Sequence, residues 1–509
     1  MTFGKGKPPK DRFFLAYICF VLHGIGFLLP WNVFINAREY FVDYKLNTKS
    51  SATSDYRINF LSYIAIGAQL PNLLMGAWNT FFQSKSSASN PTIRFLIVMS
   101  LEFVILLFTT ILVFVDTSQV PALFFGLTMV SVVLINCCVG IHQTLTFGLA
   151  AYLPMRYSNA VIIGSNTCGV FVASVNMIAK GISQLWGKTE KSIIIATTSY
   201  FSVGTLYVVI CIASYLLMQR LEFVRYYLDF ASSADGKDDE EGDLISKTHE
   251  KRDSIPISDE DADNSSTKPT VSKFVESASF DNEERGDNKE GKAQGDIKDD
   301  SSKTTTLRNC FAVCCYSKAE GRVKCTEYWG RYVETFKECW VQCLTVWMVF
   351  TCTLSVFPAI QATVRPISPD YFIPENWFAD VTCYFFFNLF AMLGCVVSSW
   401  VKFPGPRFLW IPVLIRMVIF IPYFMVSNYL PTGPGGRRMP LWVKNDHVYV
   451  VGSVVFAFTN GYFSSLAMMY APSKSPPERA GLAGLLASFF LILGVFCGCY
   501  ITRGLVALL

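Results

Sequence analysis

Amide and aromatic side chains recur at helical spacing inside long apolar segments of this sequence. The stretch Gly24–Tyr40, GIGFLLPWNVFINAREY, places Trp31 and Asn32 directly after Pro30. A proline removes one backbone hydrogen bond, so a helix through this stretch should bend there. An amide at membrane depth needs a bonding partner or a solvated cavity. A Trp at the membrane interface beside a packed Asn would explain the same residues, so this stretch alone leaves both interpretations open.

Polar and small residues interrupt five further apolar segments, and in three of them they follow one helical face. They are Gln69, Pro71, Asn72 and Asn79; Asn136, Gly140 and Gln143; Asn166, Gly169, Ala173 and Asn176; Tyr384, Asn388, Ala391 and Cys395; and Thr459, Asn460, Gly461 and Tyr462. One or two such residues would only join neighbouring helices, at about 0.6 kcal/mol per contact. Amides on so many helices favour a polar cavity instead. Amides, an indole and a phenol suit a neutral, flat, hydrogen-bonding solute.

Two ionisable residues lie within or beside the third apolar segment. Glu102 is a candidate cation or proton site, or a partner for a neighbouring helix. Arg94 could pair with Glu478 as a gate, but an arginine that snorkels to the membrane surface is the slightly favoured interpretation. His142, next to Gln143, has no evident partner. The sequence contains no metal-ligand spacing, no nucleophile beside a base and no Gly-rich phosphate loop. We therefore expect that the protein binds no metal or cofactor and is not an enzyme.

The composition indicates a membrane protein built from helices. Hydrophobic residues make up 52% of the 509 residues and charged residues only 16%, whereas a soluble protein has about a quarter of its residues charged. Apolar runs of this length indicate membrane-spanning helices. A net charge of +4 is too small to suggest nucleic acid as a partner. Most of the sixteen cysteines lie in or beside apolar runs, so they do not predict a disulfide framework.

About eleven spans are expected, divided six plus five by one long polar segment. The first group lies near 13–36, 58–82, 93–115, 121–149, 158–183 and 193–218, and the second near 338–361, 377–401, 408–427, 447–471 and 480–506. The predicted divisions are an N-terminal tail (1–12), a six-helix half (13–218), a cytosolic loop (219–337) and a five-helix half (338–509). Flanking Lys and Arg residues favour a cytosolic N-terminus and an extracellular C-terminus.

The segment 231–309 is rich in Ser, Asp, Glu, Lys and Gly and almost free of aromatic residues, which predicts a disordered cytosolic loop. Within it, 251–254 and 258–261 resemble kinase acceptor sites, and 240–245 resembles an acidic dileucine sorting signal. Kinases and sorting adaptors are therefore candidate partners. The plasma membrane is the expected location, and the endosomal or lysosomal membrane is the alternative.

Six stretches of the sequence resemble the signatures of the equilibrative nucleoside transporters. They are LLPWNVFINAREYF in the first span, FGLAAYLP after Gln143, RLEFVRYY after the sixth span, LSVFPAI in the seventh, FNLFAMLG in the eighth and FAFTNGYFSSLAM in the tenth. The matches are collinear and cover nearly the whole chain except the polar loop. The resemblance implies eleven helices, a cytosolic N-terminus, a large loop between helices six and seven, and a fold like that of the major facilitator class.

The resemblance also implies a central substrate site. Its residues would be Trp31, Asn32, Ile35, Gln69, Gln143, Phe357, Tyr384 and Asn388. In this picture the amides bond base and ribose while the aromatic rings sandwich them. The family usually has an Asp and an Arg that meet the ribose where this chain has Ala391 and Cys395. Because losing such groups changes selectivity strongly, either the sugar is held differently or the substrate is a nucleobase or another small solute.

The sequence therefore predicts a monomeric, facilitative transporter of nucleosides or nucleobases that works in the lipid bilayer by alternating access between its two halves. No ATP site is evident, so the substrate gradient should drive the flux, with weak proton coupling through Glu102 or His142 left open. An organic-cation or monoamine carrier is the alternative within transport. A transport-inactive scaffold or receptor, whose long loop recruits partners, is the alternative from another class.

Overall fold

A computed structural model describes residues 8–37, 39–48, 51, 54–58, 60–82, 91–186, 190–231, 320–430 and 436–509. The chain divides into two compact units, Met1–Gly236 with Gly330–Leu509 and Lys237–Trp329. Apart from 320–329, the described residues belong to the first unit. The predicted disorder of 231–309 and its kinase and sorting motifs lie outside the described residues, apart from Ala231. In the described residues the chain is helical, with one isolated β-bridge between Val364 and Tyr429.

Six long helices precede the polar segment. They are α1 (Leu15–Asn36), α3 (Phe60–Phe81), α4 (Pro91–Phe114), α5 (Pro121–Ala151), α6 (Arg156–Trp186) and α7 (Glu190–Met218). Shorter helical pieces accompany them, η1 (Arg12–Phe14), η2 (Glu39–Lys45) and α2 (Asp55–Ile58). Pro30 lies inside α1 and Pro71 inside α3, and both helices continue past their proline.

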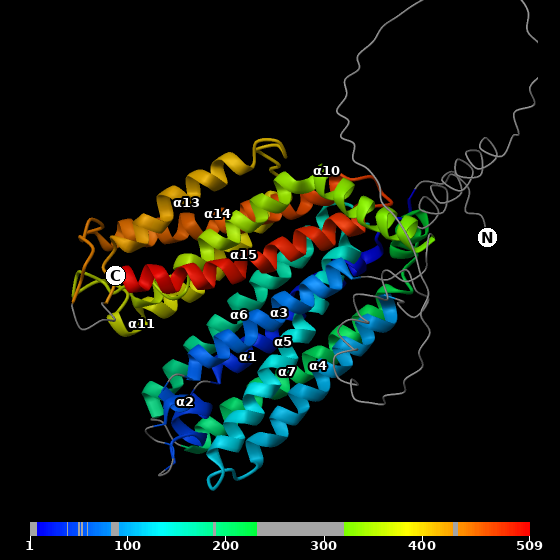
Figure 1. The fold of residues 1–509 in the computed structure, drawn as a ribbon. Coiled ribbons are helices and arrows are strands. Elements are labelled where there is room, and N and C mark those ends of the chain that lie inside the picture. Colours follow the sequence, from blue (N-terminus) through cyan, green and yellow to red (C-terminus); the bar gives the residue numbers. More distant parts are fainter. Residues whose placement is uncertain are drawn as a thin grey trace, which may run out of the picture. The chain divides into compact units, whose positions relative to one another are not determined.

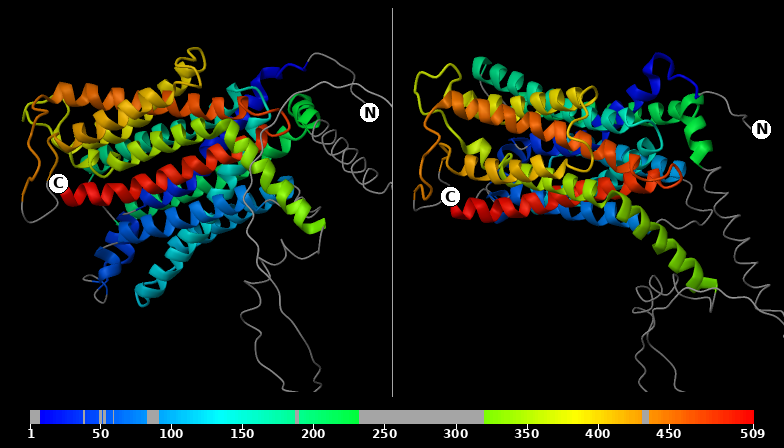
Figure 2. Two further views of the ribbon diagram at one scale, coloured as in Figure 1. Left: turned by 45° about the horizontal axis from the view of Figure 1, so that its top comes forward. Right: turned by 90° about the horizontal axis from the view of Figure 1, so that it is seen from above.

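Five long helical stretches follow the polar segment. They are α10 (Glu320–Val356), the broken helix made of α11 (Glu375–Ala379), η4 (Asp380–Phe385) and α12 (Phe386–Ser398), then α13 (Trp410–Met425), α14 (Asp446–Ser473) and α15 (Ala480–Leu508). A short 3-10 turn, η3 (Gln361–Thr363), comes after α10. Figures 1 and 2 show these helices running alongside one another, with the C-terminus and α11 at one end.

Nine of the described helices are long and apolar enough to cross a membrane. The remaining two long ones are α13, with 16 residues, and α3, which carries several amides. Together they give the eleven helices and the all-α, multi-pass architecture that the sequence predicts. One boundary differs, because α10 begins at Glu320, well inside the segment predicted as loop. Its first turns contain charged residues that are good helix formers, and Tyr332 and Thr335 are buried.

Small residues let helices of one half approach closely. A Cβ on Gly24 of α1 would lie 2.1 Å from the Val161 carbonyl oxygen of α6, and one on Gly164 would lie 2.1 Å from the Val21 carbonyl oxygen. On the other half, a Cβ on Gly461 of α14 would meet α12 backbone in the same way. Backbones in direct contact explain why these positions carry no side chain.

We call the two ends of the helix bundle the N-side and the C-side. The N-side holds the starts of α1, α6 and α15, and the C-side holds α11 and Leu509 (Figure 1). On the N-side the halves are tied together: the Tyr332 hydroxyl of α10 donates to the Thr80 carbonyl oxygen at 2.6 Å, and α15 packs against α3 and α5. No extensive contact joins α1 to a helix of the second half among the described residues.

Candidate functional site

The α1 residues predicted to bind solute lie beyond Pro30, in the C-side part of the helix. Asn32 Nδ2 donates to the Leu28 carbonyl oxygen at 3.0 Å and contacts Cys168 Sγ of α6 at 3.6 Å. Trp31 is half-buried, and Ile35 is exposed. No helix of the second half packs extensively on α1 in the described part of the chain, so the second half does not enclose these residues in this conformation.

Buried amide atoms without hydrogen bonds mark the neighbouring pair α3 and α5. Gln69 Oε1 and Asn72 Oδ1 are buried and have no hydrogen-bond partner among the residues that the structure describes. The side chain of Gln143 is also buried and makes no hydrogen bond in the described part of the chain. Unpaired buried polar atoms each cost about 1–3 kcal/mol, so they are the groups that a polar solute or water would satisfy. This is the observation that favours a binding site over simple helix packing.

The second half contributes an aromatic group from α12 and the turn after α10. Phe357 stacks on Phe387 with ring centroids 4.0 Å apart, and it meets Tyr384 edge-on at 6.3 Å. Asn388 Nδ2 donates to the Tyr384 carbonyl oxygen at 2.9 Å. A Cβ on Gly169 of α6 would lie 1.9 Å from Asn388 Oδ1, so the halves touch there and glycine is required.

Helix α6 is the common neighbour of the two groups. Cys168 contacts Asn32 of α1, and the next residue, Gly169, contacts Asn388 of α12. Asn32 of α1 and Asn388 of α12 therefore meet α6 at the same level, in directions about 100° apart around its axis. Gln69 and Gln143 belong to the pair α3 and α5, which packs on the same half as α1.

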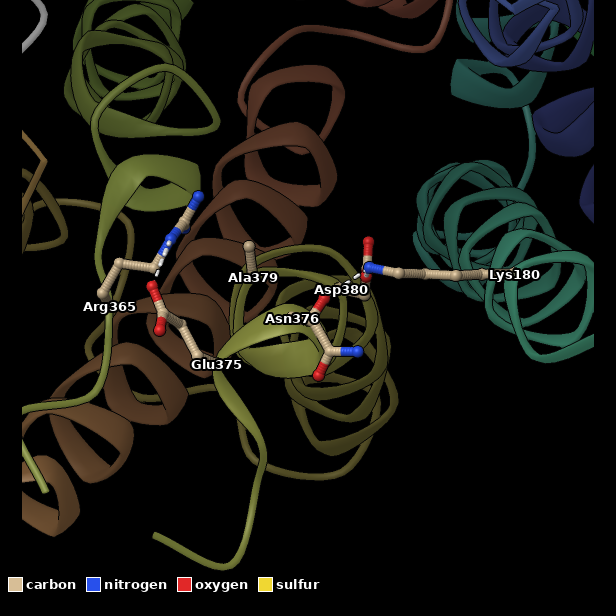
Figure 3. Close-up of a pocket in the computed structure, with 6 residues that line it drawn as sticks. All are labelled: Lys180, Arg365, Glu375, Asn376, Ala379 and Asp380. Atoms are coloured by element: carbon tan, nitrogen blue, oxygen red, sulfur yellow. Dashed lines mark hydrogen bonds and ion pairs between the residues drawn. The ribbon is translucent and has the colours of Figure 1, made fainter. Parts of the chain in front are cut away.

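A polar pocket of about 560 Å³ opens on the C-side, between the two halves. Figure 3 shows Lys180 reaching from α6 toward Asp380 of η4, while Arg365 and Glu375 face each other nearby. Lys180 forms an ion pair with Asp380 and also donates to the Asn376 carbonyl oxygen. Arg365 Nε lies 3.8 Å from Glu375 Oε1. These charges were not predicted as site residues, since they lie at segment ends where charge is common.

The predicted pairing of Arg94 with Glu478 is wrong for this conformation. Arg94 Nη1 instead donates to Asn79 Oδ1 at 3.2 Å. The residue after Glu478, Arg479, makes the ion pairs at this end, with Glu334 at 2.6 Å and Glu338 at 2.8 Å. Both acids lie on α10, in the part predicted as loop or at its edge, which is why the sequence did not suggest them.

His142 is not alone, contrary to the sequence analysis. Its Nδ1 lies 3.3 Å from both carboxylate oxygens of Glu102, and its Nε2 lies 3.2 Å from Nδ1 of His23. Glu102 of α4 therefore pairs with α5, which is one of the two roles proposed for it, and this contact does not exclude the other role as a proton site. His23 was missed altogether, although an ionisable side chain inside the first apolar segment was the signal that could have found it.

A buried arginine in α13 was also missed. Arg416 donates to the hydroxyls of Thr353 at 2.9 Å and Thr459 at 3.2 Å, and to the carbonyl oxygens of Val349 and Phe456. Its guanidinium lies 4.3 Å from the centre of the Phe456 ring. These contacts supply acceptors and a cation–π interaction but no carboxylate, so the residue fixes α10, α13 and α14 together.

Comparison with known proteins identifies the family. A family model described as "Nucleoside transporter" matches residues 129–506, which is most of the chain. This chain belongs to the nucleoside transporter family. It is 30% identical to equilibrative nucleoside transporter 2 of Mus musculus, with 97% of each chain covered. It is 28% identical to equilibrative nucleoside transporter 1 of Mus musculus and 27% identical to that of Homo sapiens, with 96% of each chain covered.

The fold is similar to that of a solved major facilitator superfamily transporter. The solved structure of the proton:xylose symporter XylE, bound to 6-bromo-6-deoxy-D-glucose, aligns with a TM-score of 0.53 over 96% of this chain and 87% of that chain. The sequence identity is 11%, so this likeness concerns the fold alone. It agrees with the major-facilitator-like arrangement that the sequence resemblance implied.

The two positions where this nucleoside transporter family member departs from the family pattern are filled by packing. Ala391 and Cys395 are both fully buried. The Ala391 backbone lies directly against Gly461 of α14. Cys395 Sγ contacts Asn166 Nδ2 of α6 at 3.3 Å and the Gly461 carbonyl oxygen at 3.4 Å. There is no open gap in the wall at these residues.

Proposed function

We propose that the chain is a facilitative transporter of nucleosides, and of nucleobases as a second substrate class. The observation that carries the proposal is the set of amides on α3 and α5 that make no hydrogen bond among the described residues, at Gln69, Asn72 and Gln143. The side-chain oxygens of Gln69 and Asn72 are buried, and so is the residue Gln143. Amide groups of this kind match the donors and acceptors of a base. Relatives of similar length carry the name equilibrative nucleoside transporter.

Alternating access is supported by the way the halves meet. The N-side is held closed by α15 against α3 and α5 and by the Tyr332–Thr80 bond, while α1 lacks extensive contact with the second half in the described residues. We propose a cytosolic N-side and an extracellular C-side, so that this conformation faces outward. The plasma membrane is the proposed location, with the endosomal or lysosomal membrane as the alternative.

An organic-cation carrier is the less favoured alternative. A carrier for cations needs an acidic side chain that the solute can reach, and Glu102 was its candidate. Glu102 is fully buried and occupied by His142. A transport-inactive scaffold is disfavoured for another reason, because a scaffold would have no use for unpaired amides inside its bundle.

Uptake of uridine into lipid vesicles that contain the full chain tests the function. Uptake should be saturable, need neither sodium nor ATP, and stop when the concentrations on both sides are equal. Gln143→Ala should lower uptake at low uridine concentration by about 5–150-fold, the equivalent of about 1–3 kcal/mol for a lost bond to the substrate. Asn136→Ala is the matched control, since that α5 amide already donates to the Val132 carbonyl oxygen at 2.8 Å. Uptake no faster than in empty vesicles would refute the proposal.

A competition panel separates the substrate classes. Unlabelled nucleosides, nucleobases and organic amines are each added against labelled uridine. We expect nucleosides to compete best and nucleobases more weakly, because a base alone engages the amides but not the groups around the sugar. Strong competition by amines and none by nucleosides would support the cation carrier instead.

A further inference from the structure

Four polar side chains, each from a different helix of the N-terminal half, form one line of close contacts. Both carboxylate oxygens of Glu102 on α4 lie 3.3 Å from Nδ1 of His142 on α5. Nε2 of His142 lies 3.2 Å from Nδ1 of His23 on α1. Nε2 of His23 lies 3.2 Å from the hydroxyl of Ser214 on α7. The groups follow one another in series, and no metal-binding cluster was found in the residues that the structure describes.

The line of contacts lies in apolar surroundings. Glu102, His142 and His23 are each at most 1% exposed. The aromatic and thiol side chains around them are Phe27, Phe95, Tyr215, Cys19, Cys138 and Cys211. No lysine or arginine contacts the carboxylate among the described residues. A negative charge on Glu102 can therefore be balanced only by a proton on Glu102, His142 or His23.

The hydroxyl of Ser214 indicates how many protons the line of contacts holds. The hydroxyl of Ser214 has one hydrogen and two acceptors within reach, the Cys211 carbonyl oxygen at 2.8 Å and Nε2 of His23 at 3.2 Å. When that hydrogen goes to the nearer acceptor, Nε2 of His23 is the donor in the longer contact. A neutral imidazole carries a single N–H, and Nδ1 of His23 must then accept from Nε2 of His142. Nδ1 of a neutral His142 is left without a hydrogen, and its contact with Glu102 requires a further proton.

Three contacts therefore hold three protons, one more than two neutral imidazoles supply. With this extra proton the group of Glu102, His142 and His23 has no net charge, wherever along the line the proton lies. Without it the group carries one negative charge in a place that has no exposed surface. A buried charge that no opposite charge balances is strongly disfavoured, so the arrangement without net charge is the favoured one.

We propose that Glu102, His142, His23 and Ser214 form a binding site for one proton, which stays bound through the transport cycle and holds α1 in place. All four residues belong to one half, which moves as a body in alternating access, and the three ionisable groups have almost no exposed surface from which the proton could leave. The part of this proposal that concerns transport rests on the proposed function.

Helices α1 and α5 connect the proton site to the solute residues. His23 precedes Trp31 by eight residues, about 12 Å along the helix axis. His142 is the chain neighbour of Gln143. A Cβ on Gly26 would lie 3.5 Å from the His142 ring, so α1 and α5 are in close contact at this level. A negative charge appearing between them should therefore disturb the helix that presents Trp31.

Nitrogen NMR of ¹⁵N-histidine-labelled full-length protein in lipid nanodiscs tests the proton count directly. The chain has four histidines, and His447→Gln, an exposed residue, removes one signal and serves as the control. With the proton bound, His23 and His142 should both carry a hydrogen on Nε2 at neutral pH. In the empty site the hydroxyl of Ser214 turns to His23, and both imidazoles carry their hydrogen on Nδ1 only. Finding that second pattern at neutral pH would overturn the proton site.

Uridine uptake with equal pH on both sides of the membrane tests the link to transport. Wild-type uptake should be steady at low pH and fall by about tenfold per pH unit above the point where the single proton leaves. The amide of Glu102→Gln can donate to His142 without an extra proton, so its uptake should not fall there. Glu222→Gln, in an exposed glutamate, should keep the wild-type profile. Equal profiles for Glu102→Gln and wild type would overturn the link.

Two further measurements complete the test. Ser214→Ala is the substitute test if Glu102→Gln does not fold. It removes the hydrogen-bond acceptor of His23 and should move the fall in uridine uptake to lower pH. A pH profile of uptake equal to that of the wild type counts against the proton site. A pH-sensitive dye inside the vesicles should show no acidification when uridine enters. Acidification that uridine drives in the wild type and that Glu102→Gln abolishes would overturn the proposal that the proton stays bound. Predicted histidine signals without any uridine uptake would refute the proposed function and leave the proton site standing.

Discussion

Asn159 on α6 joins the two halves by hydrogen bonds at the N-side. Its Nδ2 donates to the Cys395 carbonyl oxygen at 2.9 Å and to the Ser399 hydroxyl at 2.8 Å, at the end of α12. Both bonds must break when the N-side opens. Asn159→Ala removes them without removing a bond within α6, so we expect it to favour the open N-side.

The size of the shift follows from the two bonds. Each contributes about 0.5–1.5 kcal/mol net, so losing both changes the balance between the closed and open N-side by about 1–3 kcal/mol. This corresponds to a change of about 5–150-fold in the ratio of the two states. The upper end applies if the Cys395 carbonyl oxygen and the Ser399 hydroxyl stay dry and unpaired after the substitution.

The thiol of Cys395 reports this change, because it is fully buried between α6, α12 and α14 in the closed state. Maleimide labelling of Cys395, read by peptide mass spectrometry on protein in nanodiscs, should speed up by the same factor in Asn159→Ala. Ser398→Ala is the matched control, since Ser398 Oγ bonds the same Cys395 carbonyl oxygen at 2.7 Å but within α12. An unchanged labelling rate in folded Asn159→Ala would refute the reasoning.

Three further predictions concern the second half and its contacts. Asp380→Asn weakens the ion pair with Lys180 that joins the two halves on the C-side. Because the Asp380 and Lys180 side chains are 27% and 37% exposed, the pair contributes about 0.2–1 kcal/mol. Its loss favours the state with an open C-side and a closed N-side, so maleimide labelling of Cys395 should slow by up to about fivefold. Thr353→Val leaves the buried Arg416 one acceptor short and should cost about 1–3 kcal/mol, seen as a lower unfolding temperature with no change in substrate preference. Ala391→Asp places a carboxylate in a packed helix interface, so it should lower the unfolding temperature and not raise uridine uptake; a stable variant with faster uptake would contradict this packing.

The positions of the helices were predictable because each long apolar run must span the bilayer and satisfy its own backbone. Amides inside those runs were predictable as site candidates for the same reason. In the described part of the chain, Gln69 Oε1 is buried and unpaired, and the buried Gln143 side chain is also without a hydrogen bond. The start of α10 was not predictable from apolarity, since its first turns from Glu320 are polar and helical at once.

Contacts between helices could not be read from the sequence. His142 lies 40 residues from Glu102 and 119 from His23 along the chain, and spacing within one helix says nothing about which faces of two helices meet. The same limit explains why this conformation does not show the suggested pairing of Arg94 with Glu478. Each side chain was placed correctly at a segment end, but helix rotation decides whether it meets an acid, an amide or solvent.

Ala391 and Cys395 change the expectation for how a sugar would be held. If the missing Asp and Arg had left a hole, a solute group or water could fill it. The structure instead fills these positions with α14 and α6. Hydrogen bonding to a ribose must then come from groups outside this part of α12, and the unpaired amides of α3 and α5 belong to the other half. Substrate selectivity should therefore respond more to substitutions at Gln69 and Gln143 than to any at Ala391.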